Sequence, residues 1–186
     1  NFPESRLGHL PPPQWKKKRF RMPWTRADSI LTSIGQGYCL TTPLELAVMA
    51  ARLASGRRVE PTLNYQKGER SFSSLPFRTH HLEALRRALF AVVNQPRGSA
   101  FRWRLDRGNF RIAGKTATSQ VRRITAQERR EGVVHNDDLP WERRDHAIFI
   151  GHAPAHQPEY ALSIVVEHGG SGGRTAAPLA HKIFSF

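Results

Sequence analysis

The chain contains a single cysteine, Cys39, among its 186 residues. One thiol cannot form a disulfide within the chain, and it cannot supply a cysteine-rich metal site. Long apolar runs are also absent, because the longest candidates, 147–150 and 161–166, have strand length, whereas a membrane-spanning helix needs roughly 18 apolar residues. Any membrane anchor is therefore expected to lie outside these residues.

Acidic residues are few, with 15 Asp and Glu against 29 Lys and Arg, which gives a formal net charge of +14. Such a balance raises nucleic acid or an anionic membrane surface as a partner. The best local support is the basic run 16–21, because the flanking Trp15 and Trp24 offer rings that stack on bases. No recognised nucleic-acid module shows its pattern, so a basic nucleic-acid-binding module remains only an alternative function.

Turn and capping residues predict three helices. One begins after Thr42, since Thr42 is a good N-cap, Pro43 suits the first helical position and Glu45 completes a capping box, and it ends at Gly56. A second spans about 80–94, and a last helix begins near Thr175. The apolar stripe of the second helix is expected to be core; it consists of Leu82, Leu85, Leu89 and Val92.

The first 32 residues are rich in proline and basic side chains. Because Pro11, Pro12 and Pro13 disfavour a regular helix, residues 1–32 are predicted to be an extended surface segment.

Three segments have the alternation or apolar content of strands: 109–121, 146–152 and 160–167. They are predicted to form one antiparallel sheet, with the third strand central because it is apolar enough to be covered on both faces. The charged connection 122–144 is predicted to be a long surface loop. The fold class is therefore mixed α/β, an antiparallel sheet flanked by helices.

The segment Gly114-Lys115-Thr116-Ala117-Thr118 places a lysine and two hydroxyls at the end of a strand-like run. Two further segments accompany it in order and spacing: Ser33-Ile34-Gly35-Gln36-Gly37-Tyr38 and Val165-Val166-Glu167-His168-Gly169-Gly170-Ser171-Gly172-Gly173. With these motifs, the chain resembles the C-terminal part of the transpeptidase domain of class B penicillin-binding proteins, most closely penicillin-binding protein 2 of the cell-elongation type. The resemblance implies a serine β-lactamase or D,D-transpeptidase-like fold.

The family's active-site signature is S-x-x-K, then S-D-N, then K-T-G, with the first serine as nucleophile. No serine in this chain has a lysine three residues later, and no S-x-N triplet occurs. The nucleophile is therefore expected to lie upstream, so that residues 1–186 are the C-terminal part of the domain and inactive alone.

In the resembled family, the residues matching Lys115 to Thr118 form one wall of the active site. The resemblance implies that Lys115 stabilises anionic groups and that the Thr118 backbone N–H donates to the oxyanion. The substrate-binding residues would be Lys115, Thr116, Ala117 and Thr118. The family has glycine where this chain has Ala117. A penicillin-binding-like protein with weakened catalysis is therefore a second alternative to an active enzyme.

The resemblance also implies function and partners. The intact protein would be a peptidoglycan D,D-transpeptidase that serves cell-wall elongation and cell shape. Peptidoglycan stem peptides, β-lactams and a SEDS-type glycan polymerase would be its partners, at the periplasmic face of the bacterial inner membrane.

No cofactor or metal is predicted. His146, His152 and His156 lack a carboxylate or cysteine at zinc-site spacing. The glycine-rich segment 168–175 departs from the phosphate-binding pattern, because it is one residue short and has Arg174 in place of lysine. It is predicted to be an ordinary turn between the last strand and the last helix.

Overall fold

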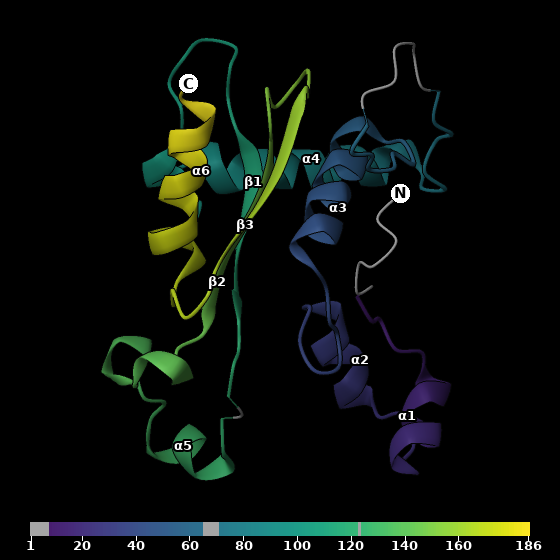
Figure 1. Cartoon of the computed structure of the whole chain (residues 1–186), viewed down its shortest axis with the longest axis vertical. Coiled ribbons are helices and arrows are strands. Elements are labelled where there is room, and N and C mark those ends of the chain that lie inside the picture. The colour runs from purple at the N-terminus through teal and green to yellow at the C-terminus, as the bar shows by residue number, and fades with distance from the viewer. Residues whose placement is uncertain (1–7, 65–70, 123) are drawn as a thin grey trace.

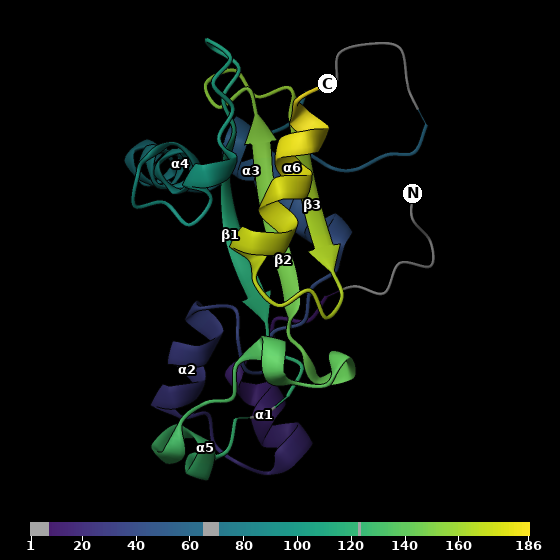
Figure 2. The same cartoon turned by 90° about the vertical axis from the view of Figure 1, so that its left-hand side faces the viewer.

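The computed structural model describes residues 8–64, 71–122 and 124–186. Its centre is an antiparallel sheet in the order β1-β2-β3, made of Ala113–Ser119, His146–Ala153 and Tyr160–Val166. The predicted antiparallel pairing is confirmed, with Thr116 opposite Phe149 and Phe149 opposite Ile164. The strand order makes β1, which carries residues Lys115 to Thr118, an outer strand of the sheet (Figure 2).

The prediction that the third strand is central is wrong for the described residues, in which β2 has a strand on each side. Burial follows this order, because Ala147, Phe149 and Ala153 of β2 are fully buried, whereas the residues of β3 are half-buried or exposed. The apolar content of β3 is instead used against the helices on its two faces, with α3 behind the sheet and α6 in front of it in Figure 2.

Three of the described α-helices pack against the sheet. Helices α3 (Pro43–Ser55) and α6 (Ala177–Phe184) lie on opposite faces of the sheet, and α4 (Thr79–Asn94) lies beside β1 (Figures 1 and 2). The core is a continuous cluster of α4, sheet and α6 side chains that includes Val93, Ile112 and Phe149. The outer strand β1 is thereby held firmly along one side.

The capping box predicted at Thr42 is present. Thr42 Oγ1 accepts a hydrogen bond from Glu45 N, Glu45 Oε2 accepts one from Thr42 N, and Gly56 ends α3 in a left-handed conformation. Backbone donors at Thr42 and Gly8 lower the pKa of Glu45, which stays ionised and ties residue 8 to the start of α3. In α4, Leu82 is buried as predicted, but Leu85 is 47% exposed and lies outside the core.

The prediction of an extended segment over 1–32 is wrong for its described part. Helix α1 (Pro13–Phe20) begins at Pro13, because a proline in the first helical position has no N–H that needs a partner. Helix α2 (Arg26–Ser33) begins with a capping box between Thr25 and Asp28. Residues 1–7 lie outside the described part of the chain.

The long connection between β1 and β2 contains the short helix α5 (Ala126–Glu131) and two 3₁₀ turns. It projects beyond the sheet, beside the end of β1 (Figure 1). None of the helices in the described part of the chain is long and apolar enough to cross a membrane.

Candidate active site

The Lys115-Thr116-Ala117-Thr118 segment lies on the outer strand β1, with its side chains alternating between the two faces. Lys115 and Ala117 are exposed, whereas Thr116 is buried, with 8% of its surface exposed. Lys115 Nζ donates a hydrogen bond to Thr116 O. It has no acidic partner among the residues that the structure describes, so its charge is available to a ligand.

Thr116 is held from the other side by Ser99. The two hydroxyl oxygens, Ser99 Oγ and Thr116 Oγ1, lie 2.6 Å apart, and either can be the donor. Ser99 lies in the turn after α4, and its neighbour Gly98 approaches the carbonyl oxygens of Ala91 and Val92 so closely that no side chain fits there. Sequence reasoning missed Ser99, because nothing local relates this serine to a strand 17 residues later.

The glycine-rich segment after β3 also belongs to the site. Its residues Gly172–Ala176 form a single turn of π-helix. A Cβ on Gly172 would overlap the backbone oxygens of Ala117 and Ile148, so the turn lies directly against β1 and β2. A Cβ on Gly173 would lie 2.7 Å from Ser99 O. The predicted turn is therefore present, and the structure adds that it packs on the Lys-Thr strand.

The Ser33–Tyr38 segment contacts the other end of this strand. Gln36 Nε2 donates to Thr118 O at 3.3 Å, a contact that joins positions 82 residues apart. Gly35 and Gly37 both have positive φ, which glycine adopts without strain and which shapes this turn after α2. All three motifs quoted from the sequence therefore converge on β1.

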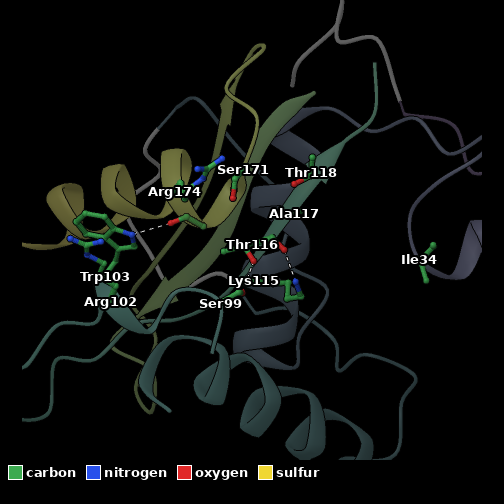
Figure 3. A pocket seen from close by; sticks show the side chains of 12 residues that line it. Ile34, Ser99, Arg102, Trp103, Lys115, Thr116, Ala117, Thr118, Ser171 and Arg174 are labelled. Atoms are coloured by element: carbon green, nitrogen blue, oxygen red, sulfur yellow. Dashed lines mark hydrogen bonds between the residues drawn. The ribbon is translucent and has the colours of Figure 1, made fainter. Parts of the chain in front are cut away.

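Together these segments line a cavity of about 850 Å³ along the outer side of β1 (Figure 3). In the figure, Trp103 and Arg102 lie at one end and Ile34 lies well apart at the other. The lining residues are Ile34, Ser99, Arg102, Trp103, Lys115, Thr116, Ala117, Thr118, Ser171, Gly172, Gly173 and Arg174. All four sequence-predicted site residues are among them, and Arg102 and Trp103 were not predicted.

Lys16 and the flanking Trp15 ring belong to a local structural unit, whereas the other basic residues of the run 16–21 are exposed. Lys16 is buried and forms an ion pair with Asp28, and hydrogen bonds from Lys16 and Thr25 lower the pKa of Asp28 to about 2. Trp15 packs against Phe20 and Tyr38, with ring centroids 5.5 and 5.3 Å away. Its ring therefore serves internal packing, which removes the main local argument for stacking on bases.

The histidines do not gather into a metal centre in the part of the chain that the structure describes, where no group of three potential ligands occurs. His146 Nδ1 accepts a hydrogen bond from His168 N, so it serves the end of β3. His152 is 1% exposed, and burial lowers its pKa, which keeps the ring neutral.

Fold and site together define a class. An antiparallel sheet between helices, whose outer Lys115–Thr118 strand and packed glycine-rich turn line one cleft, is the arrangement expected from the resemblance to penicillin-binding proteins. The comparison with known families agrees, because the family model described as "Penicillin binding protein transpeptidase domain" matches residues 1–185. The chain belongs to this family.

Curated relatives narrow the similarity to one kind of penicillin-binding protein. The peptidoglycan D,D-transpeptidase MrdA of Acinetobacter baumannii is 34% identical over 198 residues, which cover 100% of this chain and 28% of the relative. The MrdA of Haemophilus influenzae is 31% identical and is covered to 29% of its length. The chain thus spans less than a third of these relatives.

Solved structures agree with the sequence relatives. Penicillin-binding protein 2 of Helicobacter pylori, in complex with MreC, superposes with a TM-score of 0.80 at 28% identity, covering 98% of this chain and 31% of that one. Penicillin-binding protein 2 of Pseudomonas aeruginosa, in complex with WCK 5153, gives 0.70 at 29% identity, covering 96% and 36%. The mixed α/β fold class predicted from the sequence is confirmed.

Proposed function

We propose that residues 1–186 are the C-terminal part of the transpeptidase domain of a peptidoglycan D,D-transpeptidase, and that they supply one wall of its active site. The observation that carries the proposal is the Lys115 to Thr118 strand, which lies at the edge of the sheet and lines the cavity. The relatives named as D,D-transpeptidases support it, and the chain covers only 28 to 29% of their length, which leaves room for the other wall.

The reaction is acyl transfer through a serine that another part of the protein supplies. The serine oxygen attacks the carbonyl carbon of a peptide bond between two D-residues, and the terminal D-residue leaves as an amine that takes up the serine proton. An amine of a second stem peptide then attacks the ester, forms the cross-link and releases the serine. Each step passes through a tetrahedral oxyanion.

The residues of β1 act on the charges of this reaction. The Thr118 backbone N–H donates to the oxyanion, and the Lys115 ammonium stabilises anionic groups in the cleft. The hydroxyls of Thr116 and Thr118 bind the terminal carboxylate of the peptide or of a β-lactam. Ser99 holds the Thr116 hydroxyl at 2.6 Å and so fixes its position for this role.

Partners and location follow from the same proposal. The similarity to penicillin-binding protein 2 of Helicobacter pylori, in complex with MreC, and of Pseudomonas aeruginosa, in complex with WCK 5153, supports the assignment to the elongation type. The proposed partners are stem peptides, β-lactams and a SEDS-type glycan polymerase. The proposed site of action is the periplasmic face of the inner membrane.

The test uses the intact protein and a fluorescent penicillin. Lys115→Ala should slow acylation on the order of 10²- to 10³-fold, because one preorganised electrostatic contact to the transition state is lost. Lys182→Ala is the matched control, since Lys182 is exposed on α6 and does not line the cavity. Equal acylation rates for Lys115→Ala and wild type, measured by stopped flow, would show that β1 is not an active-site wall.

A further inference from the structure

The cavity along β1 is lined by more positive charge than the proposed chemistry uses. Arg102, Lys115 and Arg174 line it, and no lining residue in the described part of the chain is acidic. Lys115 is assigned to the reacting end of the substrate. Two arginines therefore remain, in a cavity of about 850 Å³ that extends well beyond the Lys-Thr strand.

Of these two arginines, Arg102 is the one without an acidic partner in the described part of the chain. Its guanidinium lies 5.6 Å from the centroid of the Trp103 ring, and it makes no ion pair or hydrogen bond among residues 8–64, 71–122 and 124–186. Arg174, by contrast, donates to Asp137 Oδ2 at 3.2 Å. The guanidinium N–H groups of Arg102 are therefore available to an anionic ligand.

The ring that supports Arg102 is itself fixed. Trp103 Nε1 donates to Gly173 O at 2.9 Å, a bond visible in Figure 3, and His181 Nδ1 donates to Trp103 O at 3.2 Å. Trp103 is thus tied both to the glycine-rich turn and to α6. A guanidinium stacked on a fixed ring loses little freedom when it binds, and its planar fork matches a carboxylate in two parallel hydrogen bonds.

We propose that Arg102, stacked on Trp103, binds a side-chain carboxylate of the acyl-donor stem peptide. This subsite is separate from the binding of the terminal carboxylate by Thr116 and Thr118, and it selects donors that carry a second negative charge. The inference rests on the proposed function, because it assigns a substrate class to the same cavity.

The experiment compares two synthetic peptides that end in D-alanyl-D-alanine and differ only in one side chain, a free carboxylate in one and its carboxamide in the other. Formation of the acyl-enzyme by the intact protein is followed by mass spectrometry, so only the donor is tested. Wild type should prefer the carboxylate peptide by about tenfold in acylation efficiency, the effect of one charge-assisted hydrogen-bonding pair. Arg102→Ala should bring this ratio close to one.

Two further variants test whether the preference for the carboxylate peptide comes from the Arg102 guanidinium. Arg102→Lys keeps the charge without the planar fork and should retain only part of the preference. Arg104→Ala is the matched control, because Arg104 also stacks on a ring, that of Phe101 at 4.2 Å, yet does not line the cavity. It should keep the wild-type ratio. Because both peptides are compared within one variant, the ratio does not depend on how much of the variant is active.

Equal reactivity of wild type with the two peptides would overturn the subsite and leave the transpeptidase function standing. A preference that survives in Arg102→Ala would assign carboxylate recognition to another residue and would likewise overturn it. If neither of the two peptides nor penicillin acylates the wild-type protein, the proposed function and the subsite are overturned together.

Discussion

Ser99 Oγ lies 2.6 Å from Thr116 Oγ1, which makes a serine at the end of a turn the direct neighbour of the predicted substrate-binding strand. Thr116 is buried, whereas Ser99 is exposed and lines the cavity. A ligand in the cavity therefore meets the Ser99 hydroxyl together with that of Thr116. Either hydroxyl can donate in this hydrogen bond. When Ser99 donates to Thr116 Oγ1, the Thr116 hydroxyl hydrogen is free to donate to a ligand carboxylate.

Replacing Ser99 with alanine tests this pairing. Without Ser99, the Thr116 hydroxyl loses its partner, and a lost hydrogen bond of about 1 kcal/mol corresponds to a roughly fivefold slower acylation. Ser119→Ala serves as the control, since Ser119 lies on the same strand but does not line the cavity. The second-order rate constant for penicillin acylation is the measurement, and an unchanged constant would remove Ser99 from the site.

Gly172→Ala tests the close contact between the glycine-rich turn and the sheet. The added Cβ would overlap the backbone oxygens of Ala117 and Ile148, which cannot move without displacing β1 and β2. Forced overpacking of this kind costs about 1–3 kcal/mol, so both thermal stability and acylation rate should fall. Glu167→Ala, at an exposed position near the start of the same connection, should change neither. A fully stable Gly172→Ala protein would contradict the contact.

Ala117→Gly tests the departure from the family pattern. Ala117 is exposed and lines the cavity, so removing its methyl group widens the cleft without opening a hole in the core. We expect penicillin acylation of the intact protein to be unchanged or faster. The control is Ala126→Gly, an exposed alanine at the start of α5. Slower acylation by Ala117→Gly would show that the methyl group is part of a working site.

The Lys16–Asp28 pair predicts a pH dependence. The folded-state pKa of Asp28 is about 2, below its ordinary value of 3.8, so the unfolded chain binds more protons as the pH falls between these values. The stabilisation is present above about pH 4 and is lost as the pH falls through about 2. The difference in melting temperature between wild type and Asp28→Asn should therefore shrink over this range. Asp106→Asn, whose carboxylate is largely exposed, should show no such difference, and a gap independent of pH would contradict the assignment.

Local signals in the sequence predicted much of the fold. Thr42, Glu45 and Gly56 set the ends of α3, because a cap needs only side chains within one turn of the helix. Thr25 and Asp28 form the same kind of cap, but the expectation of an extended segment over 1–32 rested on the prolines and basic side chains alone, so α2 was not predicted. The central position of the third strand was predicted wrongly for the described sheet, since apolar content reports burial and not the order of strands.

The candidate site, too, was determined in part by the sequence and in part by the tertiary structure. The sequence determined the strand that carries Lys115 to Thr118, because alternation and motif lie within a few consecutive residues. Only the tertiary structure decided that Ser99, Trp103 and Gly172 complete the cavity beside it. Trp103 and Gly173 lie 70 residues apart in the sequence, and their contact exists only because the sheet and α6 bring the two turns together. A pattern of nearby residues specifies elements, whereas packing of the core specifies which elements meet.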